Sequence, residues 1–156
     1  MTIQVKGLRK KYFNKEAVKG VDFTIEPESI IGLLGRNGAG KSTVLNMIAR
    51  RIEKTSGDIT LDGVDLHKTP RAMHQVYLSS TENWFPKEYK FKDLLSIYKK
   101  TYPEFDSDFA EDLIKVFGVN VKERFSKAST GYQSIMKIIL ALCNPSEYIF
   151  MDEPVL

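Results

Sequence analysis

The residues best suited to chemistry in this sequence form a glycine-rich run that ends in a lysine and two hydroxyl residues. The run matches the pattern G-x-x-x-x-G-K-[ST], in which tight backbone turns direct several amide N–H groups toward one anion. Its members are Gly35, Arg36, Asn37, Gly38, Ala39, Gly40, Lys41, Ser42 and Thr43. The pattern predicts a loop that binds the phosphates of a nucleotide such as ATP.

Each residue type in this loop has a physical reason. Gly35, Gly38 and Gly40 permit positive φ and leave no β-carbon in the path of a phosphate. We expect a helix to begin near Lys41, so that its N-terminal amides and its dipole face the anion. The Lys41 ammonium is expected to reach the β- and γ-phosphates, and the Ser42 hydroxyl to bind Mg²⁺, which prefers oxygen ligands. The alternative is a glycine-rich turn whose lysine is only solvated.

A second group of polar residues, Asp152 and Glu153, directly follows the apolar stretch Tyr148–Met151 and has the form of a Walker B element. Ligands of open parallel sheets bind beyond the carboxyl ends of the strands. If this strand neighbours the one before the glycine-rich loop, Asp152 can hold Mg²⁺ directly or through water. Glu153 can then polarise the attacking water as a general base. The alternative is an acidic turn that simply ends a strand.

The first third of the chain has the pattern of strands and turns. The apolar run Ser29–Leu34 comes just before the glycine-rich loop and predicts a strand covered on both faces. After the loop, Leu45, Ile48 and Ile52 are spaced for one face of a helix. Alternating apolar residues predict half-buried strands at 2–6, 21–25 and 57–61, the last of them before a hairpin turn at Asp62-Gly63.

The middle of the chain has the periodicity of helices. One helix is expected over 91–102 and is ended by Pro103, and a second is capped by Asp106 or Ser107 and stopped by Gly118. A third carries 135–142, with strands expected before and after the helices, at 76–78 and at 148–151. The order is a β-rich part, a helical insert and a return to a buried strand.

Composition limits the class of protein. The 156 residues suffice for one ordinary domain, and 42% hydrophobic with 28% charged residues is typical of a globular chain. A net charge of +3 is too balanced to favour nucleic acid as the main partner. The single cysteine, Cys143, excludes an intrachain disulfide and fits a reducing, cytosolic setting. No apolar run approaches the roughly 20 residues that span a bilayer.

The segment Ala128-Ser129-Thr130-Gly131-Tyr132-Gln133 resembles the signature motif of ATP-binding cassette (ABC) proteins, although Ala128 and Thr130 depart from its usual Leu-Ser-Gly-Gly-Gln form. With the phosphate loop, it makes the whole chain similar to the ATP-binding subunit of an ABC transporter. The resemblance implies an α/β fold of the P-loop NTPase class, with a mostly parallel sheet, an N-terminal antiparallel β part and a helical insert. It further implies a single ABC ATPase domain with a core over 1–78, an insert over 87–143 and a return to the core over 144–156.

The resemblance also implies roles for individual residues. Tyr12, or alternatively Phe13, would stack on adenine, and ATP and Mg²⁺ would be the cofactors. Ser129 and Gly131 would contact a nucleotide held by a second subunit, unless Ser129 is only a helix cap. The family usually places a Mg²⁺-sensing glutamine where this chain has Ser80, so Ser80 is a possible further metal ligand. Glu82 is a possible substitute for that glutamine.

The resemblance implies two partners, a second ATPase subunit in a head-to-tail dimer and a transmembrane permease subunit. The expected location is therefore cytoplasmic, on the inner face of the membrane, with no nucleic acid partner. Trp84 and Phe85 are candidate contacts with the permease, or they fold beneath the helical insert. Separate membrane subunits suggest a bacterial exporter. His67 and His74 do not match the family's switch histidine and are expected at the surface or in the core.

The sequence ends three residues after Glu153, where the family continues with further strands. The resemblance therefore implies an incomplete cassette, truncated after the Walker B element, that binds ATP but hydrolyses it weakly or not at all. One alternative is a non-transport ABC ATPase of translation or DNA repair. Another is a nucleotide-binding fragment without turnover.

Overall fold

A computed structural model describes residues 1–69, 74–80 and 82–154 of the chain. Contacts between α-carbons divide the chain into two compact units, Met1–Val76 and Tyr77–Leu156. The phosphate loop lies in the first unit, and the acidic pair and the signature segment lie in the second. No helix in the described ranges combines the length and the apolar character that crossing a membrane requires.

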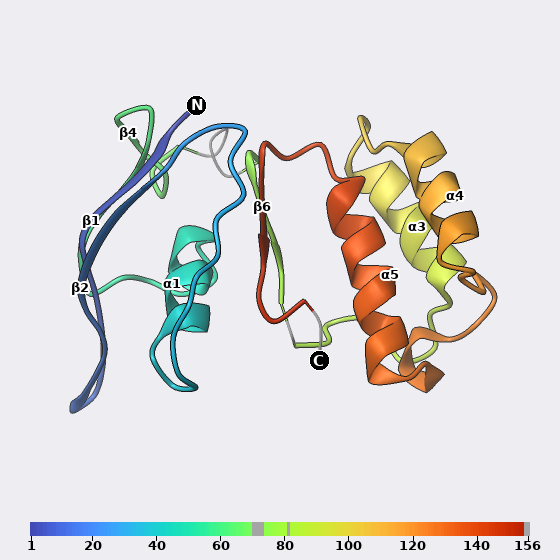
Figure 1. The fold of residues 1–156 in the computed structure, drawn as a ribbon, viewed down its shortest axis with the longest axis horizontal. Helices are drawn as coiled ribbons and strands as arrows, with labels where there is room; N and C mark the ends of the chain where they lie inside the picture. The colour runs from blue at the N-terminus through green and yellow to red at the C-terminus, as the bar shows by residue number, and fades with distance from the viewer. Residues whose placement is uncertain (70–73, 81, 155–156) are drawn as a thin grey trace. The chain divides into compact units, whose positions relative to one another are not determined.

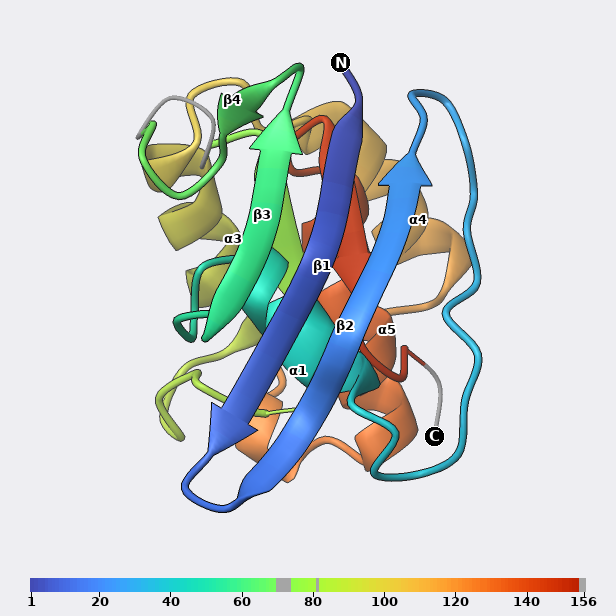
Figure 2. The ribbon, with the colours of Figure 1, turned by 90° about the vertical axis from the view of Figure 1, so that its left-hand side faces the viewer.

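A four-stranded antiparallel sheet is the frame of the first unit. Its elements are β1 (Ile3–Tyr12), β2 (Lys15–Ile25), α1 (Lys41–Ile48), β3 (Ser56–Leu61) and β4 (Val64–Asp65). The strand order is β2-β1-β3-β4, and α1 lies against one face of the sheet (Figure 2). Ile3 of β1 pairs with Ile25 of β2 on one side and with Leu61 of β3 on the other.

The predicted strands of this unit are confirmed where apolar and polar residues alternate. Ile3, Val5 and Leu8 are buried, whereas Gln4 and Lys6 between them are exposed. The predicted hairpin turn at Asp62-Gly63 joins β3 to β4. The alternation of apolar and polar residues predicts these strands correctly because one face of the sheet packs on the apolar side of α1, which buries Met47 and Ile48.

The helix after the phosphate loop is shorter than its apolar spacing suggests. The spacing of Leu45, Ile48 and Ile52 predicted one helical face, but α1 ends at Ile48. Arg50 follows with φ 53°, a left-handed backbone conformation that does not continue a helix. Ile52 therefore belongs to the turn that leads into β3.

The prediction of a buried strand over Ser29–Leu34 is wrong. This segment belongs to neither sheet of the described residues, and the side chains of Ile30 and Leu34 are 105% and 93% exposed. A strand covered on both faces needs a ladder partner as well as an apolar sequence. The backbone turns just before the segment, where Glu28 has φ 54° and the Ser29 hydroxyl donates to the Glu26 carbonyl at 2.6 Å.

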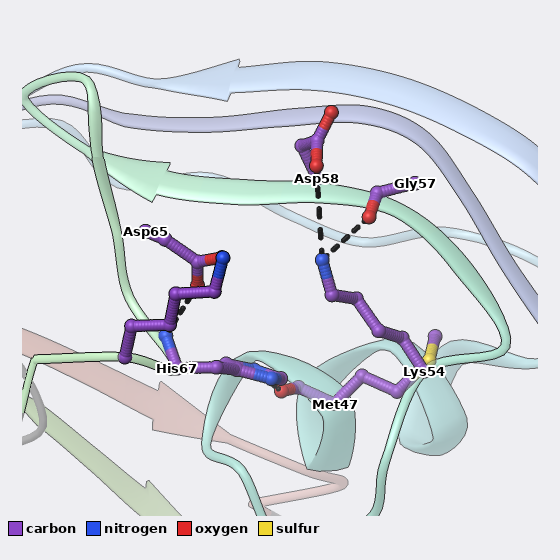
Figure 3. A network of polar contacts seen from close by, with 7 residues as sticks. Met47, Lys54, Gly57, Asp58, Asp65 and His67 are labelled. Carbon is purple, nitrogen blue, oxygen red and sulfur yellow. Dashed lines mark hydrogen bonds and ion pairs between the residues drawn. The ribbon is translucent and has the colours of Figure 1, made fainter.

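His67 is a core residue, which is one of the two expected placements. Its ring Nε2 lies 2.7 Å from the Met47 carbonyl oxygen near the end of α1, and its backbone amide donates to the Asp65 carboxylate at 2.8 Å (Figure 3). That amide is the main cause that holds the pKa of Asp65 below its ordinary value, with Lys54 and Lys68 adding positive charge nearby. The contact between His67 and Met47 thus ties the turn after β4 to α1.

The second unit combines a short sheet with a group of helices. Its elements are β5 (Val76–Ser79), α3 (Phe91–Thr101), α4 (Ser107–Val116), the 3-10 turn η1 (Phe125–Lys127), α5 (Thr130–Leu142) and β6 (Tyr148–Met151). β5 and β6 form a two-stranded parallel sheet, and the helices lie between them in the chain (Figure 1). The three predicted helices and the two predicted strands of this part are confirmed.

Local signals account for the helix boundaries of this unit. The Asp106 carboxylate caps α4 by accepting the Phe109 amide at 2.9 Å, and Gly118 with φ 62° follows the helix end. The helices share one apolar core, to which α5 contributes Met136, Ile139 and Leu140. Phe91 and Phe125 are its largest fully buried members.

Candidate functional site

The phosphate loop leads into the N-terminus of α1 as predicted. Gly40 is the N-cap, with φ 94°, and the Val44 amide makes the first helical bond to the Gly40 carbonyl at 2.9 Å. The amides of Lys41, Ser42 and Thr43 therefore precede the first intrahelical bond, which is the position from which a helix presents N–H groups to an anion.

The loop closes around its own lysine. The Lys41 ammonium donates to the carbonyl oxygens of Gly35 at 2.9 Å and of Arg36 at 3.2 Å. The Ala39 amide donates to the Arg36 carbonyl at 3.0 Å, which makes the turn that contains Asn37 and Gly38. Arg36–Ala39 are exposed to solvent. A positive group framed by an exposed glycine-rich turn and a helix N-terminus fits the charge of phosphate groups.

β2 supports the loop from one side. A β-carbon on Gly40 would lie 2.6 Å from the Ala17 carbonyl oxygen and 3.2 Å from a methyl carbon of Val18. Val18 pairs with Lys10 of β1, two residues before Tyr12. The start of α1 is thus packed against the same hairpin that carries the aromatic residue expected at the adenine.

Tyr12 ends β1 and is 43% exposed, so it is not the core residue that an aromatic in a strand commonly is. The Lys10 ammonium lies 4.8 Å from the centre of its ring, a cation–π distance. Phe13 follows in the hairpin turn with φ 48° and is 99% exposed. Both aromatic side chains are accessible for stacking.

In the second unit, the acidic pair follows β6 as predicted. The Asp152 amide donates to the Ser79 carbonyl at 2.9 Å, so Asp152 and Ser80 leave neighbouring strands. Asp152 is buried, whereas Glu153 is exposed and has φ 49°. The turn thus separates the two carboxylates into different environments. Within the described ranges, no group of three or more His, Cys, Asp or Glu side chains is arranged to hold a metal ion by itself.

A pocket of about 50 Å³ adjoins the acidic pair. Its lining combines the end of β5, the first turns of α5 and the residues after β6. The polar lining residues include Ser80, Thr130, Gln133, Lys137, Asp152 and Glu153. The structure therefore brings together the predicted Walker B residues and Ser80, the predicted further metal ligand.

Lys137 is the residue of this pocket that the sequence analysis missed. Its ammonium donates to the carbonyls of Ser80 at 2.9 Å and Glu82 at 3.2 Å. Burial lowers the pKa of Lys137. Its place on α5 as a polar residue between Met136 and Ile138 was the one available signal.

The signature segment begins α5. The Ser129 hydroxyl is the N-cap and accepts the Tyr132 amide at 3.3 Å. The Gln133 side chain donates to the Ala128 carbonyl at 3.0 Å. A β-carbon on Gly131 would meet nothing within 4 Å. Ser129 therefore acts as a helix cap, and Gly131 is exposed in the first turn.

Trp84 and Phe85 differ in their surroundings. Trp84 is 75% exposed, whereas Phe85 is partly buried and packs edge-on against Phe125 with ring centres 4.9 Å apart. Of the two alternatives, folding beneath the helices applies to Phe85. Trp84 keeps the exposure that a partner contact needs.

Comparison with known proteins adds to this geometry. Residues 18–156 match the family described as "ABC transporter". The ATP-binding protein YtrB of Bacillus subtilis is 33% identical over 97% of this chain, and the lipopolysaccharide export ATP-binding protein LptB of Haemophilus influenzae is 30% identical over 97%. The chain spans 52% of YtrB and 67% of LptB. The ribose import ATP-binding protein RbsA of Halalkalibacterium halodurans is 29% identical over 99% of the chain and is covered over 34% of its own length.

Solved structures share the fold. A putative ABC transporter ATP-binding protein from Pyrococcus furiosus superposes with a TM-score of 0.85 over 100% of this chain and 77% of its own, at 22% identity. A second ATP-binding subunit of an ABC transporter gives 0.86 at 23% identity, with 68% of its own chain covered. The predicted fold class is confirmed. By its phosphate loop, its fold and its match over most of its length, this chain belongs to the ABC transporter family.

Proposed function

We propose that this chain is the nucleotide-binding part of an ATPase subunit that powers a transporter. The observation that carries the proposal is the exposed loop at the start of α1, where Lys41 is framed by the carbonyls of Gly35 and Arg36. Two bonds use two of the three N–H donors of an ammonium, which leaves capacity for a phosphate oxygen. Such a loop binds ATP rather than a neutral ligand.

The proposed chemistry is ATP hydrolysis. Asn37, Gly38, Ala39, Gly40 and Thr43 bind the phosphates together with Lys41, and Tyr12 stacks on the base, which is worth about 1–3 kcal/mol in nucleic-acid binding proteins. Mg²⁺ prefers oxygen ligands, which the side chains of Ser42 and Asp152 would supply. The oxygen of Ser80 would be a further ligand. The ion would neutralise charge on the transferred phosphoryl group.

Glu153 is the proposed general base. It follows the buried Asp152 and is itself exposed, so it can accept a proton from water. Ser129 and Gly131, in the exposed first turn of α5, are the proposed contacts with a nucleotide held by a second subunit. The three-part division into 1–78, 87–143 and 144–156 is part of this proposal.

The proposed partners are a second ATPase subunit and a transmembrane permease, with the chain on the cytoplasmic face of the membrane. The 75% exposure of Trp84 supports a contact with the permease at that residue. Export is the proposed direction, because LptB belongs to a lipopolysaccharide export system, although RbsA is a ribose import protein. Uptake and efflux assays on membrane vesicles that carry the complete transporter distinguish the two directions.

Nucleotide binding is tested by replacing Lys41. Lys41→Ala should weaken ATP binding by about tenfold or more, since it removes a charge-assisted contact with phosphate. Lys68→Ala is the matched control, because Lys68 is an 83% exposed lysine of the same unit that pairs only weakly with Asp65 at 3.7 Å. Equilibrium titration with a fluorescent ATP analogue measures both. Equal affinity of the Lys41→Ala variant and the parent chain would refute the proposal.

Hydrolysis is tested separately by phosphate release. In the complete subunit, Glu153→Gln should keep ATP binding and lose turnover, since the amide cannot accept the proton. Glu147→Gln is the control for removal of one carboxylate from the same unit. Phosphate release by Glu153→Gln at the parent rate would contradict the assignment of the base and leave the binding assignment intact.

A further inference from the structure

A lysine of α5 holds the segment that follows β5. The Lys137 ammonium donates to the main-chain carbonyls of Ser80 at 2.9 Å and Glu82 at 3.2 Å. Because both acceptors are backbone atoms, these bonds fix the path of the chain itself. We use the name post-β5 segment for the described residues 80 and 82–86.

The polar side chains of the post-β5 segment give it little support, whereas Phe85 holds its far end by packing edge-on against Phe125. The Ser80 hydroxyl lies 3.5 Å from the Glu82 carbonyl, at the limit of a hydrogen bond. The Asn83 side chain accepts the Phe85 amide at 3.4 Å, which is also long. Hydrogen bonds from an ionised donor are roughly twice as strong as neutral ones. Lys137 is therefore the strongest polar restraint described for this segment.

The environment of Lys137 favours these bonds. The side chain is partly buried, and burial lowers its pKa because an ammonium loses hydration there. A charged group that has lost water needs hydrogen-bond partners to be tolerated. The carbonyls of Ser80 and Glu82 are such partners, so these two bonds offset part of the cost of burial.

Lys137 also stands at a functionally important position. It lines the pocket that Asp152, Glu153 and Ser80 line, and it lies on the helix that Ser129 caps. The Asp152 amide bonds to Ser79, so the post-β5 segment begins beside the acidic pair. A restraint on Ser80 therefore sets the distance between its oxygen atoms and the Asp152 carboxylate.

We propose that Lys137 is a positioning residue that couples α5 to the post-β5 segment and holds Ser80 in register with Asp152 and Glu153. The proposal rests on the proposed ATPase function for its catalytic consequence. Its structural part, the restraint of the segment by the ammonium, is independent of nucleotide. Movement of α5 would be transmitted through Lys137 to Ser80 and onward to the exposed Trp84.

The chain provides its own reporter for the restraint. Trp84 is the single tryptophan and lies two residues after Glu82. Its fluorescence anisotropy, measured without nucleotide, reports segmental motion of the post-β5 segment. Lys137→Met keeps the length and the apolar contacts of the side chain but has no donor, and it should lower the anisotropy. Lys137→Arg keeps the charge and several donors and should retain the parent value.

Lys115→Met is the matched control, because Lys115 is an exposed lysine of α4 that pairs with Asp112 at 3.2 Å. It should leave the anisotropy of Trp84 unchanged. An unchanged anisotropy in Lys137→Met would overturn the restraint, and so would an equal loss in Lys137→Met and Lys137→Arg. If Lys137→Met does not fold, the Arg variant decides, since retained anisotropy supports the proposal and a lowered value overturns it.

The catalytic part has its own readout, a split between kcat and KM for ATP. In the complete subunit, Lys137→Met should lower kcat by about tenfold or more, because small misplacements in a site have effects of that size, and leave KM nearly unchanged. Lys137→Arg should restore most of kcat. A rise in KM at constant kcat would overturn a positioning role. If the parent chain does not bind ATP, the proposed function is refuted, whereas the anisotropy result still tests the restraint.

Discussion

The α-carbon of Gly40 lies so close to the carbonyl oxygen of Ala17 that a β-carbon at residue 40 would be 2.6 Å away from it. Real β-carbons do not approach an oxygen this closely, so the two residues can be neighbours only if residue 40 is glycine. The contact joins the N-cap of α1 to β2 and thereby fixes the direction in which the first amides of the helix point. The phosphate loop is therefore positioned by the antiparallel sheet as well as by its own turns.

Gly40→Ala should destabilise the first unit and weaken ATP binding. The left-handed φ of 94° alone costs a non-glycine residue about 1–2 kcal/mol, and the overlap with Ala17 adds to it. Gly38→Ala is the control, since Gly38 has φ 79° but no atom within 4 Å of an added β-carbon. Urea denaturation measures the free energy of unfolding of both variants. Equal losses in the two variants would show that the contact with Ala17 has no energetic role.

Ser129→Ala should lower the free energy of unfolding by about 1 kcal/mol even without nucleotide, because it removes the cap of α5. Asp106→Ala removes the cap of α4 in the same unit and should have a similar effect. If Ser129 also contacts nucleotide in a dimer, only Ser129→Ala should reduce ATP-dependent dimerisation of the complete subunit. Thermal denaturation and light scattering distinguish the two effects.

Phe85→Ala should destabilise the second unit, since it removes the edge-on contact with Phe125. The loss should be smaller than the about 3–5 kcal/mol of a fully buried phenylalanine, because Phe85 is only partly buried. Trp84→Ala should leave stability within about 0.5 kcal/mol of the parent, as is usual for exposed positions. A strong effect of Trp84→Ala on unfolding of the isolated chain would contradict its assignment as a free surface residue.

The chain should lose stability as the pH rises from about 9 to about 11 through its one thiol. Burial, and secondarily the Asp106 carboxylate, raises the pKa of Cys143 from 9.0 to about 11. Between these values the folded state binds a proton that the unfolded state has released, so unfolding becomes more favourable. Cys143→Ala should flatten this part of the pH profile. Chemical denaturation at several pH values, with the variant run in parallel, isolates the thiol from lysine and tyrosine titration.

Elements with local signals could be predicted from the sequence. The cap at Asp106 and the stop at Gly118 placed α4 within a residue or two, and the periodicity over 135–142 found α5, although that helix begins earlier, at Thr130. The apolar run Tyr148–Met151 was predicted as a strand and is β6. The phosphate loop was equally local, because its pattern contains both the turn and the helix start.

Features that depend on distant partners could not be predicted in the same way. Ser29–Leu34 has the composition of a buried strand, but no strand of the described residues pairs with it. Phe85 is partly buried and Trp84 is exposed because Phe85 packs against Phe125, which lies far along the chain. Lys137 donates to the carbonyls of Ser80 and Glu82, which are 57 and 55 residues away in sequence, and no local pattern predicts such a contact.

The exposure of Ile30, Ile31, Leu33 and Leu34 has a practical consequence for work with this chain. A run of large apolar side chains on a segment outside both described sheets offers other molecules a surface for intermolecular β-pairing. The chain should therefore aggregate increasingly as its concentration rises, and sedimentation should show particles that grow in size. A gatekeeper charge, introduced as Ile31→Lys, should raise the saturation concentration and leave the folded units intact.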